Sequence, residues 1–126
     1  MRNAAQAYLK TQVTTTSQGD ILVQLYAGAI KFLEQAKEKI DLKDYAGKGI
    51  LISKTLDIIA ELDSSLNIQK GGDLAANLHD LYHFCSTRLL MANLQMNKSI
   101  LDEVIGILDE LRQAFDQIKN VDPAQA

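Results

Sequence analysis

Tryptophan is absent from this chain, and proline and cysteine each occur only once. A single cysteine cannot form an internal disulfide, so no disulfide framework is available to hold the fold together. Proline interrupts helices and often marks turns, so its near absence leaves room for long continuous helices. The composition therefore predicts an all-α protein.

The chain also lacks a net positive charge. The formal net charge is −3, and lysine and arginine form no cluster anywhere in the sequence. Proteins that bind nucleic acid usually carry a basic patch, so we expect no nucleic-acid partner. The sequence also lacks a signal-peptide core and a membrane-length apolar run, which predicts a cytoplasmic protein with no stable membrane insertion. Its 126 residues fit a single domain.

Apolar residues recur at helical spacing in four stretches of similar length. The expected helices span residues 17 to about 40, 45 to 66, 73 to about 95 and 99 to about 118. Because the connections are short, sequence neighbours should be neighbours in space, which predicts an antiparallel up-down-up-down four-helix bundle. We expect this bundle to occupy residues 17–119, preceded by a short, detachable helical arm at residues 1–16 and followed by a tail at residues 120–126.

Polar residues mark where these helices should begin. Ser17 with Asp20, and Ser99 with Asp102, have the three-residue spacing of an N-terminal capping box. Residues 67–72 are expected to form a turn, after which Asp73 would cap the third helix.

The first expected helix carries more apolar surface than one packing face requires. Its apolar side chains cover about half of the helical wheel, whereas one buried stripe needs about 100°. The surplus favours a groove for a partner helix, and the alternative is a structural bundle that buries it in a homodimer. Gly28 and Gly106 each cost about 1 kcal/mol relative to alanine inside a helix, which predicts close helix packing there, with a shallow groove as the alternative.

Two histidines form the most conspicuous chemical pattern. His79 and His83 are four residues apart, so both lie on one side of a helix and could share a metal. A zinc protease would have glutamate after the first histidine, where this chain has Asp80, and a di-iron bundle would need two Glu-x-x-His motifs. We therefore expect surface imidazoles, no metal site and no cofactor, although a metal-dependent bundle enzyme remains a third class to test.

Other residues offer little chemistry. Gly71 and Gly72 follow Lys70, but no Lys-Ser or Lys-Thr pair follows as in a phosphate-binding loop, so we expect a tight reversal and no bound nucleotide. Cys85 lies on an apolar face and should be a buried, poorly reactive thiol. The carboxylates are spread over polar faces among lysines, so the sequence indicates no catalytic site.

The chain resembles the flagellar secretion chaperone FliS family from about residue 7 to residue 118. The residues that carry this resemblance are Ala7-Tyr8, Val13, Thr15-Thr16-Ser17, Leu22, Leu25-Tyr26, Gly28-Ala29-Ile30, Phe32-Leu33, Leu66, Lys70-Gly71-Gly72, Asn77-Leu78, Leu81-Tyr82, Arg88-Leu89-Leu90 and Ala92-Asn93-Leu94. The resemblance is specific because these elements keep their order and spacing over most of the chain.

The resemblance implies a non-enzymatic cytoplasmic chaperone with several partners. Such a protein binds the disordered C-terminal segment of flagellin, prevents early polymerisation and delivers flagellin to the type III export gate. It also implies that the N-terminal arm covers a groove when flagellin is absent, with Tyr8 as cap and export-gate contact. Whether a co-chaperone or regulator competes for the site stays open.

The candidate partner-binding residues are apolar or small. They comprise groove or supporting-core positions at Leu25, Tyr26, Ile30, Ile52, Ile59, Leu78, Tyr82 and Leu89, together with Gly28 and Tyr8. The sequence alone does not separate groove positions from core positions.

Overall fold

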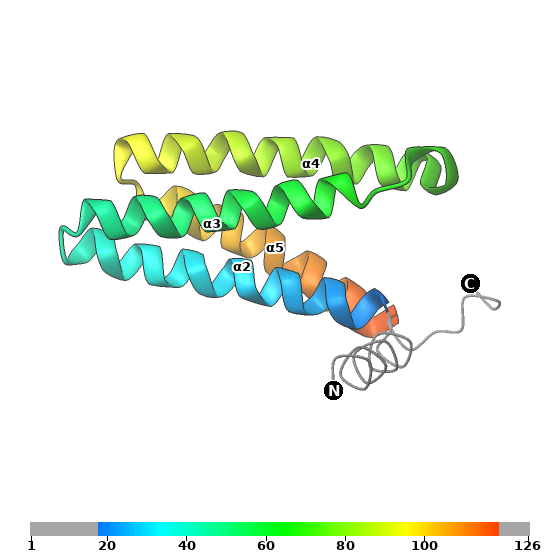
Figure 1. Ribbon diagram of the computed structural model, residues 1–126, viewed down its shortest axis with the longest axis horizontal. Coiled ribbons are helices and arrows are strands. Elements are labelled where there is room, and N and C mark those ends of the chain that lie inside the picture. Colours follow the sequence, from blue (N-terminus) through cyan, green and yellow to red (C-terminus); the bar gives the residue numbers. More distant parts are fainter. Residues whose placement is uncertain (1–17, 119–126) are drawn as a thin grey trace, which may run out of the picture.

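The protein is built from long helices, which the computed structural model describes over residues 18–118 (Figure 1). Its helices are α2 (Gln18–Asp41), α3 (Tyr45–Ser64), α4 (Ile68–Gln95) and α5 (Lys98–Ile118). No strand occurs within the described range, so the predicted all-α class is confirmed. The expected segments 1–16 and 120–126 lie outside the described residues, as does Ser17, the proposed cap of the first helix.

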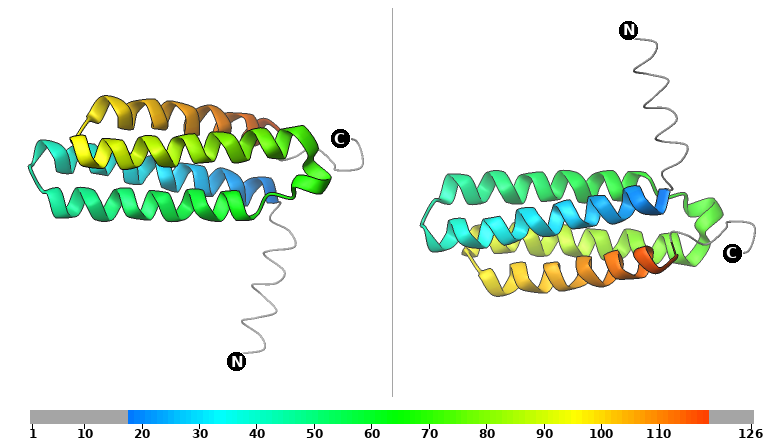
Figure 2. Two further views of the ribbon diagram at one scale, coloured as in Figure 1. Left: turned by 90° about the horizontal axis from the view of Figure 1, so that it is seen from above. Right: turned by 90° about the horizontal axis from the view of Figure 1, so that it is seen from below.

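The four helices pack in a ring. Helix α2 packs against α3 and α5, and α4 packs against the same two helices from the opposite side. Figures 1 and 2 show the alternating direction of successive helices. One end of the bundle therefore gathers the beginnings of α2 and α4 and the ends of α3 and α5. This arrangement confirms the predicted up-down-up-down bundle.

Helix α4 begins earlier than its sequence suggested. The side chain of Asn67 accepts a hydrogen bond from the backbone N–H of Lys70 at 3.1 Å, which places the helix start at Ile68. Residues 68–71 of the predicted turn are therefore helical, and the first cap is Asn67 in place of the predicted Asp73. The backbone does leave the helical conformation at Gly72, with φ 56° and ψ −133°. Helix α4 is thus one short turn, a kink and a long second part.

Helix α5 also begins from a different cap. The Asn97 side chain accepts hydrogen bonds from the backbone N–H groups of Ser99 at 2.9 Å and Ile100 at 3.3 Å. Ser99 is therefore a capped residue and not the predicted cap. Asp102, the other half of the predicted capping box, forms an ion pair with Lys37 of α2 at 2.6 Å.

The core draws side chains from all four helices. Its fully buried large members are Tyr26, Leu33, Ile52, Ile59, Leu62, Cys85, Leu89, Leu101, Val104 and Leu108. The Tyr26 hydroxyl hydrogen-bonds the Tyr82 hydroxyl, which joins α2 to α4 across the centre of the ring. Buried Lys48 donates to the Asn93 carbonyl at 2.9 Å, so this charged group also has a hydrogen-bond partner.

The two helical glycines singled out in the sequence do not mark close helix crossings. A Cβ added at Gly106 would have no neighbour within 4 Å, and one added at Gly28 would meet only Ile58 Cδ1 at 3.8 Å. An ordinary van der Waals distance requires no glycine. The described helices leave room for a methyl group at both positions. The prediction of close packing is therefore wrong at Gly106, and packing does not require glycine at Gly28.

Candidate partner-binding pocket

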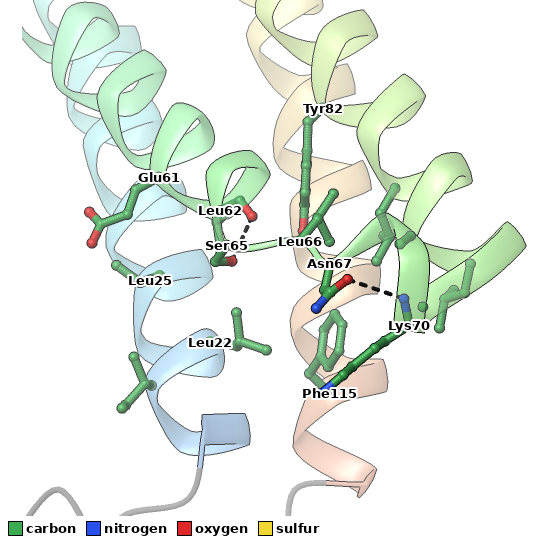
Figure 3. Close-up of a pocket in the computed structure, with 15 residues that line it drawn as sticks. Leu22, Leu25, Glu61, Leu62, Ser65, Leu66, Asn67, Lys70, Tyr82 and Phe115 are labelled. Carbon is green, nitrogen blue, oxygen red and sulfur yellow. Dashed lines mark hydrogen bonds between the residues drawn. The ribbon is translucent and has the colours of Figure 1, made fainter.

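An apolar pocket of about 570 Å³ opens where the four helix ends meet (Figure 3). Helix α2 contributes its first turns, α3 and α4 contribute their connection and adjoining turns, and α5 contributes one aromatic ring. The lining residues are Ile21, Leu22, Leu25, Glu61, Leu62, Ser65, Leu66, Asn67, Lys70, Gly71, Leu74, Ala75, Leu78, Tyr82 and Phe115. The pocket is thus mainly aliphatic, with a few polar groups.

Aromatic residues support the inner side of the pocket. Tyr82 and Phe115 line it, and the ring of Phe115 stacks on the ring of Tyr26 with 5.7 Å between centroids. Burial is the main cause that raises the pKa of both tyrosine hydroxyls above the ordinary value. Both hydroxyls are therefore neutral near pH 7, and their mutual hydrogen bond satisfies polar atoms beneath an apolar surface.

The wall between α3 and α4 depends on two adjacent glycines. A Cβ added at Gly71 would lie 2.7 Å from the Cβ of Ala75, so only glycine allows the first turn of α4 to approach the next turn this closely. Gly72 has positive φ, which glycine adopts without the steric cost of a side chain. The sequence predicted a reversal at these glycines, and the structure shows a kink that folds a short turn beside the pocket.

Two charged residues line the pocket, one on each side. Glu61 belongs to α3 and Lys70 to the first turn of α4. Figure 3 shows the Glu61 carboxylate pointing away from the apolar wall, whereas the Lys70 side chain runs toward Phe115. Within residues 18–118, neither side chain has an ion-pair partner. Lys70 is thus a free cation at the pocket mouth.

The structure divides the predicted site residues into three groups. Leu25, Leu78 and Tyr82 line the pocket. Those in the buried core are Tyr26, Ile52, Ile59 and Leu89. Ile30 is half-buried farther along α2, Gly28 also lies outside the pocket, and Tyr8 lies outside the described residues. Their contact with a partner stays a prediction.

Sequence reasoning missed most of the pocket wall. The omitted apolar residues are Ile21, Leu22, Leu62, Leu66, Leu74, Ala75 and Phe115. All of them lie near the end of a helix, and an antiparallel bundle brings these four ends together. The signal was therefore present in the predicted topology, whereas the candidates on helices all came from the first three expected helices and mostly not from their ends.

The remaining candidate groups are now placed. His79 and His83 are both exposed, as the surface interpretation predicted, and Nδ1 of His79 lies 2.6 Å from Oδ1 of Asp63. This hydrogen bond is the main cause that raises the pKa of His79. Burial raises the pKa of the Cys85 thiol to about 11. No group of three or more potential metal ligands occurs in the described part of the chain.

The fold and the pocket define a class of protein. A small helical bundle with an apolar pocket between its helix ends is suited to bind an apolar segment of another chain. Among the helices of residues 18–118, none is long and apolar enough to cross a membrane.

Comparisons with known proteins give the family. The sequence matches the family described as Flagellar protein FliS over residues 1–122, and the chain belongs to this family. It is 39% identical over 122 residues to the flagellar secretion chaperone FliS of Vibrio cholerae, covering 94% of this chain and 90% of that protein. Identity to flagellar secretion chaperone FliSB of Pseudomonas aeruginosa is 33% over 120 residues, covering 95% of each. The FliS of Salmonella typhimurium is 34% identical over 115 residues, covering 90% of this chain and 85% of that protein. The resemblance seen in the sequence is confirmed.

Proposed function

We propose that this chain is a cytoplasmic flagellar secretion chaperone without catalytic activity. It binds the disordered C-terminal segment of flagellin, keeps flagellin from polymerising early and delivers it to the flagellar type III export apparatus. Membership of the FliS family supports this function. The structural observation that carries it is the open apolar pocket at the convergence of the helix ends.

The physical task explains why such a pocket is useful. Ordering a disordered segment costs about 1 to 2 kcal/mol per residue, so binding requires broad apolar contact worth about 25 cal/mol per Å². The mainly aliphatic lining of the pocket would supply this contact for the part of the segment that enters it.

The N-terminal arm fits the same proposal. Helix α2 begins at the end of the bundle that contains the pocket, so the preceding chain starts beside it. Residues 1–16 would cover the pocket in the free protein and leave it when flagellin binds. Tyr8 would then be available to the export gate, and a co-chaperone or regulator could compete for the exposed surface.

Calorimetry with the C-terminal flagellin segment from the same organism tests the proposal. We expect one-to-one binding at micromolar or lower concentration, with the negative heat-capacity change that accompanies apolar burial. Absence of binding at micromolar concentration, or binding without this heat-capacity change, would contradict the proposed function.

A further inference from the structure

Lys70 is a feature of the pocket that neither packing nor ion pairing accounts for. It is exposed and lines the pocket, and its side chain has no ion-pair partner among residues 18–118. Its backbone N–H donates a hydrogen bond to the Asn67 side chain, whereas its ammonium group makes none within residues 18–118. The side chain therefore contributes little to the fold, and its ammonium group is free to pair with a bound molecule.

The direction of the side chain matters as much as its charge. Lys70 extends toward Phe115 along the mouth of the pocket, while the other lining charge, Glu61, points away (Figure 3). The methylene groups of a lysine can rest on apolar surface while its ammonium group reaches water. A segment whose apolar side chains enter the pocket would thus have Lys70, and not Glu61, beside its polar edge.

The arm of the same chain offers no matching charge. Residues 1–17 include Arg2 and Lys10 but no aspartate or glutamate. An ion pair with Lys70 is therefore possible for a suitable partner and impossible for a side chain of the arm. Charge at this position therefore distinguishes the two expected occupants of the pocket, because an acidic partner segment can pair with Lys70 and the arm cannot.

We infer that Lys70 selects an acidic side chain of the bound flagellin segment. The acidic residue lies one helical turn from the apolar residue that enters the pocket, so both contacts come from the same amphipathic stretch. The inference rests on the proposed function for the identity of the partner. To that function the inference adds the charge pattern expected of the bound segment. It also explains how the segment displaces the arm, which has no acidic side chain to pair with Lys70.

Two designed peptides test this selection without flagellin. Both are amphipathic helix-formers of about 20 residues, long enough to sample helix in water, and they differ only in a glutamate or lysine beside the apolar face. Each is titrated into the full-length wild-type chain, Lys70→Glu and Lys31→Glu. Lys31 is the matched control because it is exposed on α2, does not line the pocket and undergoes the same charge change.

We expect the wild type to bind the glutamate peptide about three to ten times more tightly at about 0.15 M salt, where distant charges are screened. Lys70→Glu should reverse this preference, whereas Lys31→Glu should keep it. Equal binding of both peptides, binding of neither, or the same change in both variants would overturn the inference. Circular dichroism checks that all three proteins are equally helical.

The flagellin segment is then titrated into the same three proteins. Loss of affinity in Lys70→Glu alone supports both proposals. If flagellin binds all three equally, the proposed function stands and the inference fails. If flagellin binds none of them but the peptide preference depends on Lys70, the inference about charge selection stands and the proposed function fails.

Discussion

At the scale of single residues, three glycines have three different local environments. Gly71 is needed because a side chain would meet Ala75, and Gly72 because its φ is positive. Gly106 lies in the middle of α5 with open space beside it, so nothing in the described bundle requires glycine there. Glycine composition alone could not distinguish these cases, because each depends on the local backbone conformation and on which side chains lie next to the glycine.

Alanine substitutions should therefore shift stability in opposite directions. Gly72→Ala should destabilise the fold by about 1 to 3 kcal/mol through backbone strain, and Gly71→Ala by a similar amount through overpacking against Ala75. Gly106→Ala should stabilise it by about 0.5 to 1 kcal/mol, because alanine loses less conformational freedom in a helix. Urea denaturation measures all three, and a uniform effect at the three sites would contradict the described geometry.

At the scale of helices, apolar periodicity predicted the position of each helix better than capping residues predicted where each helix begins. The apolar spacing placed the body of each helix correctly, and the reversal between α2 and α3 begins where predicted. The starts of α4 and α5 were misplaced because Asn67 and Asn97 precede other polar residues that could equally cap a helix. The pocket was harder to predict because it exists only where four separate helix ends converge.

Helices α3 and α4 are also joined beside the pocket by a pair that depends on pH. The Asp63 carboxylate raises the folded-state pKa of His79 above its unfolded value, with a smaller contribution from Asp80. The pair therefore stabilises the fold fully below the unfolded pKa of about 6.5, and this contribution is lost as pH rises through the folded pKa.

Replacement of each histidine by glutamine tests this link. His79→Gln should be less stable than the wild type at about pH 5.5, where aspartate is ordinarily ionised, and this difference should shrink by about pH 9. His83→Gln is the matched control, because His83 is exposed on the same helix and belongs to no ion pair of the described residues. Thermal unfolding at both pH values measures the effect, and a pH-independent difference for His79→Gln would argue against the pair.

At the scale of the whole molecule, the two ends of the bundle are unlike each other. One end contains the pocket, whereas the other contains the reversal between α2 and α3 and the link from α4 to α5 (Figure 1). Exposed apolar residues occur at both ends, so exposure alone does not identify a binding surface. The apolar lining of the pocket distinguishes its end, because the smaller hollow at the other end is lined by polar or charged side chains in three of six positions, Gln35, Glu38 and Lys39.

The free protein should be a monomer, because the surplus apolar surface is proposed for flagellin and not for a second copy. Light scattering should give a mass near 13.9 kDa for the free chain and a one-to-one mass with flagellin. A free dimer that dissociates when flagellin is added would show that the dimer contact and the flagellin site use the same surface. A dimer that remains intact and binds no flagellin would favour the structural bundle.

The most direct test compares one leucine at each end. Leu74 lines the pocket and Leu42 lies at the opposite end, with exposed fractions of 66% and 71%, so a charge at either position should leave the fold intact. In calorimetric titrations with the C-terminal flagellin segment, Leu74→Glu should weaken binding about tenfold or more by placing a charge against the bound apolar face. Leu42→Glu should change affinity by less than about twofold. Equal losses, or a larger loss at Leu42, would contradict the claim that flagellin binds in this pocket.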